Sequence, residues 1–411
     1  ILLSVAHGLE PEIPRLYAGI AAWLAGVILW PSVKGLARLQ ILAMLGVGAI
    51  LLAWAASMGW ATDWESVLAS NQALLSMLAA VSFLRLVTLP ASAADDPTPK
   101  GPAALRTTLL GVHLFGSVIN LSALMIIGDR LSAHRPLTPI QAQVLSRGFA
   151  MAANWSPFFA AMGVALTNAP GAQLPTLALF GLPVAALALG YTAVELGRRT
   201  EATEFAGYPL HFGALWIPAL LALAVLLIHQ LRPQVPILTL VSALSLTVTL
   251  VVVIAREGKE GLERFAAFTR TGLPRMSNEL ALFLAAGVLG TGIAAAVAVS
   301  EISLSAGSFG TLEAVGLLLA MVFLSALGIH PVISIATAGG LLAPLEPDPN
   351  LLGMVFLMTW ALGVSLSPFS GMHLAMQGRY GIDSYRFLGW NWRFALVLLA
   401  VDLAALFAYS Q

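Results

Sequence analysis

The chain has 411 residues, of which 59% are hydrophobic and 10% charged, and its 20 basic residues balance its 20 acidic residues. This charge balance excludes a basic nucleic-acid-binding surface, and the absence of cysteine excludes disulfides, thiolate metal sites and a cysteine nucleophile. Apolar runs recur along the whole chain, and each is long enough to span a bilayer core of roughly 30 Å. The composition predicts a multi-pass membrane protein, which we expect in the inner membrane of a bacterium.

Twelve apolar segments predict membrane-embedded helices. They cover 15–31, 37–60, 71–94, 105–128, 144–168, 172–194, 212–231, 236–255, 278–299, 311–345, 350–376 and 391–409. The polar connectors between them are too short to form a soluble domain. We therefore expect residues 1–411 to form one all-α membrane domain.

A short phrase occurs in two of these segments, as Asn-Trp-Ser-Pro-Phe at 154–158 and as Ser-Leu-Ser-Pro-Phe at 365–369. Proline lacks a backbone donor and interrupts a helix, so each phrase predicts a broken membrane helix. Two such breaks at corresponding places in two halves of a membrane protein are typical of a transporter site.

A second match supports a repeat of about 15–194 and 212–409. Asn71 opens a helix 85 residues before Ser156, and Asn278 opens one 89 residues before Ser367. Because each asparagine begins an apolar run, we expect both side chains to cap their helices.

The distribution of basic residues predicts the topology, because Lys and Arg concentrate on the cytoplasmic side. If all twelve segments cross the membrane, the Lys and Arg residues show no preference for either side. If 105–128 and 311–345 are instead re-entrant hairpins, 17 of the 20 basic residues lie inside, with Arg147 among those counted. The two halves are then inverted. We expect ten crossings, two opposed hairpins and two broken helices.

The hairpin tips should meet the broken helices at the middle of the membrane, because non-helical backbone at that depth survives only where protein or a water-filled cavity covers it. Tip 1 is predicted within 116–122 and tip 2 within 328–334. The candidate substrate ligands are the polar residues of the tips and breaks: Ser117, Asn120, Ser122, Asn154, His330, Ser334, Thr337, Ser365 and His373. The candidate Na⁺ ligands are Asn120, Asn154, Ser156, Ser365 and Ser367.

Structural roles are the alternative for these residues. Serine hydroxyls at a kink commonly bond their own helix, and Asn120 and Ser122 would serve a capping turn. His330 would be a neutral histidine bonded to backbone instead of a substrate contact or proton acceptor. Arg85 is expected to snorkel, with contact to an anion as its alternative.

Two inverted repeats, each with a hairpin followed by an interrupted helix, resemble the ion transporter superfamily, which includes the divalent anion/sodium symporters. Sodium/dicarboxylate members carry Ser-Asn-Thr at both tips, and Asn120 is the residue that matches directly here. The resemblance implies cation sites completed by the two Ser-Pro steps. It also implies an elevator, often dimeric, in which a transport part (105–194 and 311–409) slides against a scaffold (15–94 and 212–299). The connectors 195–211 and 256–277 would be helical arms on the membrane surface.

We therefore expect a secondary-active transporter, not an enzyme, that carries a small solute, most simply an anion. Na⁺ or H⁺ would be the coupling ion, with no covalent cofactor, and its partners would be lipid and a second copy of the chain. One alternative is a channel or passive facilitator, which needs a continuous polar stripe. Others are an intramembrane lipid-modifying enzyme, which needs a cluster such as His330, His373 and Asp402 at one depth, and the membrane subunit of a larger complex. No P-loop is present for ATP to drive transport directly.

Overall fold

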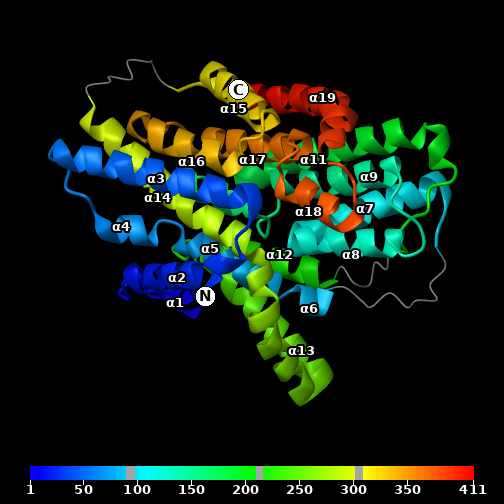
Figure 1. Cartoon of the computed structure of the whole chain (residues 1–411), viewed down its shortest axis with the longest axis horizontal. Helices are drawn as coiled ribbons and strands as arrows, with labels where there is room; N and C mark the ends of the chain where they lie inside the picture. The colour runs from blue at the N-terminus through cyan, green and yellow to red at the C-terminus, as the bar shows by residue number, and fades with distance from the viewer. Residues whose placement is uncertain (89–97, 210–215, 301–308) are drawn as a thin grey trace.

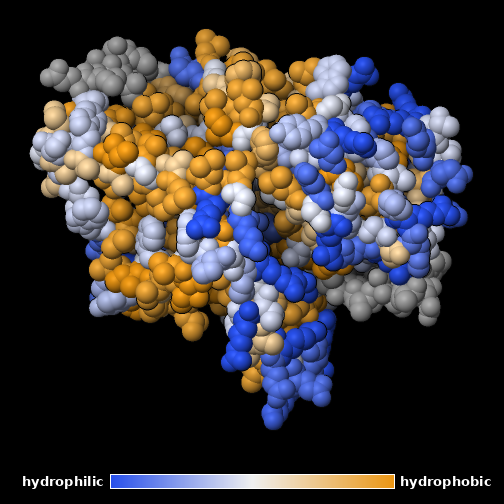
Figure 2. All heavy atoms as spheres, in the orientation of Figure 1, coloured by the Kyte–Doolittle hydropathy of each residue, from blue (hydrophilic) through white to orange (hydrophobic). Residues whose placement is uncertain are grey.

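The computed structural model describes residues 1–88, 98–209, 216–300 and 309–411. Within these ranges the regular structure is helical, apart from one isolated β-bridge between Lys100 and Ala206. Seven helical spans in the described ranges are long and apolar enough to cross a membrane. Apolar side chains cover much of the visible face, whereas charged ones gather at the projecting end of one helix and at the right-hand side (Figure 2). The chain is thus an all-α, multi-pass membrane protein, as predicted.

The helices of the first half begin with α1 (Leu2–Leu9), α2 (Arg15–Leu29), α3 (Gly35–Ser57), α4 (Trp64–Ala69), α5 (Gln72–Ser82) and α6 (Arg85–Thr88). They continue with α7 (Gly101–Ile119), α8 (Leu121–Ser132), α9 (Pro139–Ala150), α10 (Ala160–Asn168) and α11 (Leu174–Gly197).

The second half contains α12 (Trp216–Leu231), α13 (Ile237–Thr271), α14 (Ser277–Val299), α15 (Thr311–Ala326), α16 (Pro331–Leu342), α17 (Pro349–Leu366), α18 (Gly371–Tyr380) and α19 (Tyr385–Tyr409). Each predicted apolar segment coincides with one or two of these helices over its described residues. The count of ten crossings stays a prediction.

The two halves of the chain pack closely on each other. In the first half α7 packs against α9, and in the second α15 packs against α17. Between the halves α3 packs along α14, and α5 packs along α13. The inverted repeat stays a prediction.

The two repeat-defining asparagines join the halves instead of capping their helices. Asn71 Nδ2 donates to Phe283 O at 2.5 Å, and Asn278 Oδ1 accepts from Lys34 N at 3.3 Å. The prediction that these side chains cap their own helices is wrong, because the close packing of the two halves brings backbone groups of the opposite half within their reach.

The helices break at both predicted tips. α7 and α8 are joined at Asn120, which has a φ of 50°, and α15 and α16 are separated by 327–330, with Gly328 at a φ of 104°. A side chain at Gly328 would also meet the Phe369 ring at 2.4 Å, so glycine is required there. In Figure 1 the pair α7 and α8 lies at the right and α16 at the left. The assignment of these pairs as re-entrant hairpins stays a prediction.

The predicted arms have different outcomes. α13 kinks at Gly258 (φ 57°), and part of it projects from the body (Figure 1). Its helical turns continue to Thr271, and Phe268 near its end packs against Phe83. Residues 195–211 do not form a helical arm where they are described, so that prediction is wrong. After one 3₁₀ turn at Thr200–Ala202 the chain is extended, because Gly101 N donates to Phe205 O and Gly207 N donates to Pro99 O.

Glycine permits the close packing of α3 on α14. A methyl group at Gly48 would lie 2.8 Å from Val288 O, and one at Gly292 would lie 2.6 Å from Gly48 O. Membrane helices approach this closely only where small residues face each other.

We predict that Gly48→Leu lowers stability by about 1–3 kcal/mol or more, because the added side chain forces the helices apart. Gly46→Leu is the matched control, since Gly46 is exposed on the same helix with no atom within 4 Å of the added methyl position. Thermal unfolding of the purified protein measures the difference. Equal melting temperatures for the two variants would contradict this packing.

Candidate functional site

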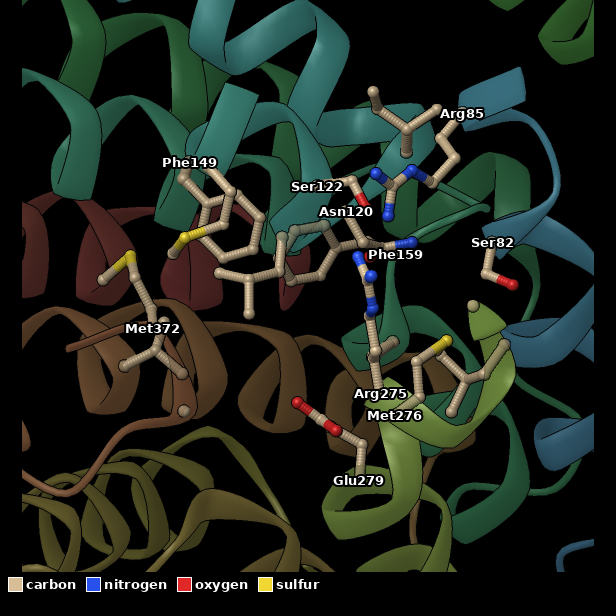
Figure 3. A pocket seen from close by; sticks show the side chains of 18 of the residues that line it. Ser82, Arg85, Asn120, Ser122, Phe149, Phe159, Arg275, Met276, Glu279 and Met372 are labelled. Atoms are coloured by element: carbon tan, nitrogen blue, oxygen red, sulfur yellow. The ribbon is translucent and has the colours of Figure 1, made fainter. Parts of the chain in front are cut away.

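A cavity of about 360 Å³ lies where the parts that we predicted as scaffold and as transport part contribute lining residues. One side is formed by α5, α6, the end of α13, the 3₁₀ turn η5 (Leu273–Met276) and α14. The other side is formed by both hairpin tips, α10, α17 and α18. Figure 3 shows Arg85, Asn120, Ser122, Arg275 and Glu279 around this space.

Four helices begin at the cavity wall: α8 at Asn120, α10 at Phe159, α16 at His330 and α18 at Ser370. The first backbone N–H groups of a helix have no partner inside it, and they carry partial positive charge. His330 caps α16 by accepting from Val332 N at 3.2 Å, and Ser370 caps α18 by accepting from His373 N at 3.2 Å. α8 and α10 have no side-chain cap. Asn120 and Phe159, at the starts of these two helices, line the cavity, and an uncapped helix start suits an anion.

Two arginines from the scaffold side reinforce this positive charge. The guanidinium groups of Arg85 and Arg275 point toward one another and toward Asn120 at tip 1 (Figure 3). Within the described ranges neither forms an ion pair. Arg379, also at the cavity, is instead neutralised by Asp129, with Nε–Oδ1 at 2.5 Å and Nη2–Oδ2 at 2.6 Å. The two unpaired cations are the strongest electrostatic feature of the cavity.

Tip 1 is fastened directly to the first Ser-Pro break. Asn120 Nδ2 donates to Phe158 O at 3.0 Å, and the hydroxyl of Ser156 donates to Ser117 O. Phe158 N in turn donates to Ser156 Oγ at 3.2 Å. These bonds satisfy backbone groups that the proline and the helix ends leave open, and they hold Asn120 at the cavity wall.

The second break is held by a buried polar network. Asn391 Nδ2 donates to Ser365 O at 2.9 Å, and His373 Nδ1 donates to Ser367 O at 2.8 Å. The proton on Nδ1 leaves His373 Nε2 to accept from the Ser146 hydroxyl, 3.1 Å away. Asn391, His373 and Ser146 are all fully buried.

Arg147 anchors this network. It is fully buried in α9, its Nε donates to Asn391 Oδ1 at 2.9 Å, and it pairs with Glu195 at 2.5 Å. It also donates to Trp390 O at 2.9 Å. Counting Arg147 with the cytoplasmic connectors was therefore wrong: the partners available in α11 and α19 allow a guanidinium inside the bundle.

The structure gathers only some of the predicted substrate ligands. Three line the cavity: Asn120, Ser122 and His330. Three donate to carbonyls of their own helices: Ser117, Ser334 and Ser365. Thr337 lies in α16 away from the cavity lining, His373 belongs to the buried network, and Asn154 lies behind the first break against Gly181 of α11.

The predicted Na⁺ ligands are likewise divided among separate places. Asn120 and Ser156 lie together at tip 1, whereas Asn154 is on the far side of the same break. Ser365 and Ser367 lie at the second break, where Ser367 Oγ accepts from Phe369 N at 3.3 Å. The hydroxyl of Ser325, in the last turn of α15, is fully buried beside Gly363 and has no hydrogen-bond partner among the described residues.

Sequence reasoning missed Arg275, Glu279 and Trp360 at the cavity and assigned Arg85 to the lipid interface. Arg275 was grouped with the basic arm, although it follows the arm in η5. The role of Arg147 could have been predicted from its position inside the apolar segment 144–168, because a charged residue in a membrane segment commonly has a functional or structural role.

The residues suggested for an enzymatic alternative do not form a cluster. His330 meets Trp360 edge to face with ring centroids 5.6 Å apart, and His373 stacks on Phe387 at 3.9 Å. Asp402 is fully buried in α19, and both of its carboxylate oxygens lack a partner within the described ranges. No group of three His, Asp or Glu that could hold a metal occurs in the part of the chain that the structure describes.

No protein-family model matches this sequence, and no curated protein matches it. The arguments about function therefore rest on the helix arrangement and on the cavity.

We predict that Arg147→Met lowers stability by about 3–5 kcal/mol, because it removes the ion pair with Glu195 and leaves the buried Asn391 side chain without its donor. Arg198→Met is the control, since Arg198 is exposed at the end of α11. Chemical or thermal unfolding in the same detergent measures both changes. If Arg147→Met and Arg198→Met unfold at the same midpoint, the network does not stabilise the protein.

Proposed function

We propose that this protein is a secondary-active transporter of a small anion. The observation that carries this proposal is the convergence of two uncapped helix N-termini and two unpaired guanidinium groups on one cavity. Each of these elements favours negative charge, and broken membrane helices in transporters bind anionic groups in the same way. A protein-enclosed cavity of this size also suits a small molecule.

The position of the cavity supports an elevator. Arg85, Arg275 and Glu279 lie on the scaffold side, whereas Asn120, Ser122 and the starts of α10 and α18 lie on the transport side. A slide of one part past the other would carry the bound anion away from the arginines and toward the opposite membrane face. In this proposal α7–α8 and α15–α16 are re-entrant hairpins that enter from opposite faces.

The open rim indicates which state the described conformation represents. Asp129 and Arg379 line the cavity and are substantially exposed. Both belong to connectors that the distribution of basic residues assigns to the cytoplasm. We therefore interpret this conformation as open to the cytoplasm.

Coupling to Na⁺ or H⁺ follows from the cost of moving an unsatisfied site through lipid. Each uncompensated polar group in the hydrocarbon costs several kcal/mol. The free N–H groups of α8 and α10 and the buried Ser325 hydroxyl are such groups when no ligand is present. A transport part whose anion and coupling-ion sites are filled, or whose site is neutral, would cross the membrane faster than one whose sites are only partly filled.

We predict that Arg85→Gln and Arg275→Gln each reduce anion uptake at least about tenfold, because a hydrogen bond to a charged group contributes about 1.5–3 kcal/mol. Proteoliposomes with an imposed Na⁺ or H⁺ gradient would be tested separately with labelled acetate, succinate, sulfate and phenylacetate. Arg270→Gln is the control, since Arg270 is exposed on the same arm outside the cavity lining. Wild-type vesicles that accumulate none of these anions, or arginine variants that transport like the control, would contradict the proposal.

A further inference from the structure

The residues that line the cavity also indicate which kind of anion it accepts. This inference rests on the proposed function. We propose that it selects a molecule with a single carboxylate on an apolar, preferably aromatic body, and that Glu279 rejects molecules with a second carboxylate. Three features of the cavity lead to this assignment.

The positive groups are confined to one end of the cavity. Arg85, Arg275, Asn120 and Ser122 lie together in Figure 3, beside the uncapped start of α8. One carboxylate can receive hydrogen bonds from both guanidinium groups and from the Asn120 amide. A planar carboxylate matches the fork geometry of arginine.

Most of the remaining wall is aromatic or aliphatic. Phe149 and Phe159 lie 5.0 Å apart between ring centroids, and Phe283 stacks on Trp360 at 6.2 Å. All four rings, together with Met372, are nearly buried and line the cavity. A hydrated inorganic anion would leave this surface unused, whereas an apolar body gains about 25 cal/mol for each Å² that it removes from water.

Glu279 places a negative charge among these apolar groups. It lies one turn after Arg275, at a spacing that commonly forms an ion pair on a helix, yet the two side chains diverge and no ion pair joins them. Its Oε1 lies 4.0 Å from the position of a methyl group on Gly371, at the start of α18. The positive end of α18 is thus already faced by a carboxylate of the protein.

This arrangement discriminates by repulsion. A second carboxylate on the ligand would meet Glu279 and would also lack an unpaired cation, because Arg379 is held by Asp129. Like charges brought together in a desolvated site are strongly unfavourable. The aromatic wall therefore selects for an apolar body, and Glu279 selects against a second charge.

The test compares phenylacetate with 4-carboxyphenylacetate, which has the same ring and one more carboxylate, and with sulfate. The full chain in lipid nanodiscs would be titrated with each, and binding would be measured by tryptophan fluorescence and by the rise in melting temperature. We expect phenylacetate to bind at least tenfold more tightly than the other two. Glu279→Gln should reduce the preference over 4-carboxyphenylacetate at least tenfold.

Glu263→Gln, on the exposed arm and paired only with Lys259 at 3.8 Å, is the control and should keep the wild-type preference. The ratio of the wild-type affinities for phenylacetate and for the other two anions is measured without any variant. It therefore tests the proposal even if Glu279→Gln does not fold. Equal or tighter binding of 4-carboxyphenylacetate or sulfate that still depends on Arg275 would overturn the selectivity and leave the anion site standing. Wild-type protein that binds none of the three, with Arg275→Gln indistinguishable from it, would overturn the anion site as well.

Discussion

The central constraint on this molecule is that backbone groups freed by a helix break inside a bilayer must find partners in the protein or in a ligand. The chain breaks its helices at two hairpin tips and at two Ser-Pro steps. Most of the freed carbonyls receive side-chain donors: Asn120 serves Phe158, Asn391 serves Ser365, and His373 serves Ser367. The starts of α8 and α10 have no side-chain cap, and Asn120 and Phe159 there line the cavity. One constraint thus accounts for the buried networks and underlies the proposal that the cavity binds an anion.

The two halves of the chain meet this constraint differently. In the proposed function, this difference determines where the anion binds. In the first repeat the tip and the break bond directly to each other, so no capping side chain covers α8 or α10. In the second, His330 and Ser370 cap α16 and α18, and Arg147 with its partners holds the break from behind. A buried guanidinium is tolerated because Glu195, Asn391 and the Trp390 carbonyl surround it. The uncapped helix starts therefore lie in the first half of the chain, and Arg85 and Arg275 lie close to the start of α8.

Patterns local in sequence predicted the fold well and the site in part. Apolar runs, the repeated Ser-Pro phrase and the Gly and Asn positions of the tips are local, and they predicted the helices and their breaks. The cavity depends on which segments meet in space, so Arg275 and Glu279 resembled arm residues. Asn71 and Asn278 were misjudged as caps, because their partners lie in the opposite half of the chain. Ser365 donates to a carbonyl of its own helix, and its role as a ligand stays a prediction. A periodic pattern indicates a helix but does not specify which carbonyl a serine bonds.

The central claim is that the cavity wall around tip 1 faces each side of the membrane in turn. The chain has no cysteine, so Ser122→Cys gives a single reporter on the transport side of the cavity. A membrane-impermeant maleimide would be applied to oriented vesicles from the inside and, separately, from the outside. The account predicts that position 122 is labelled from both faces and that an anion bound in the cavity slows the labelling. Labelling from one face only, whatever gradient is imposed, would contradict it.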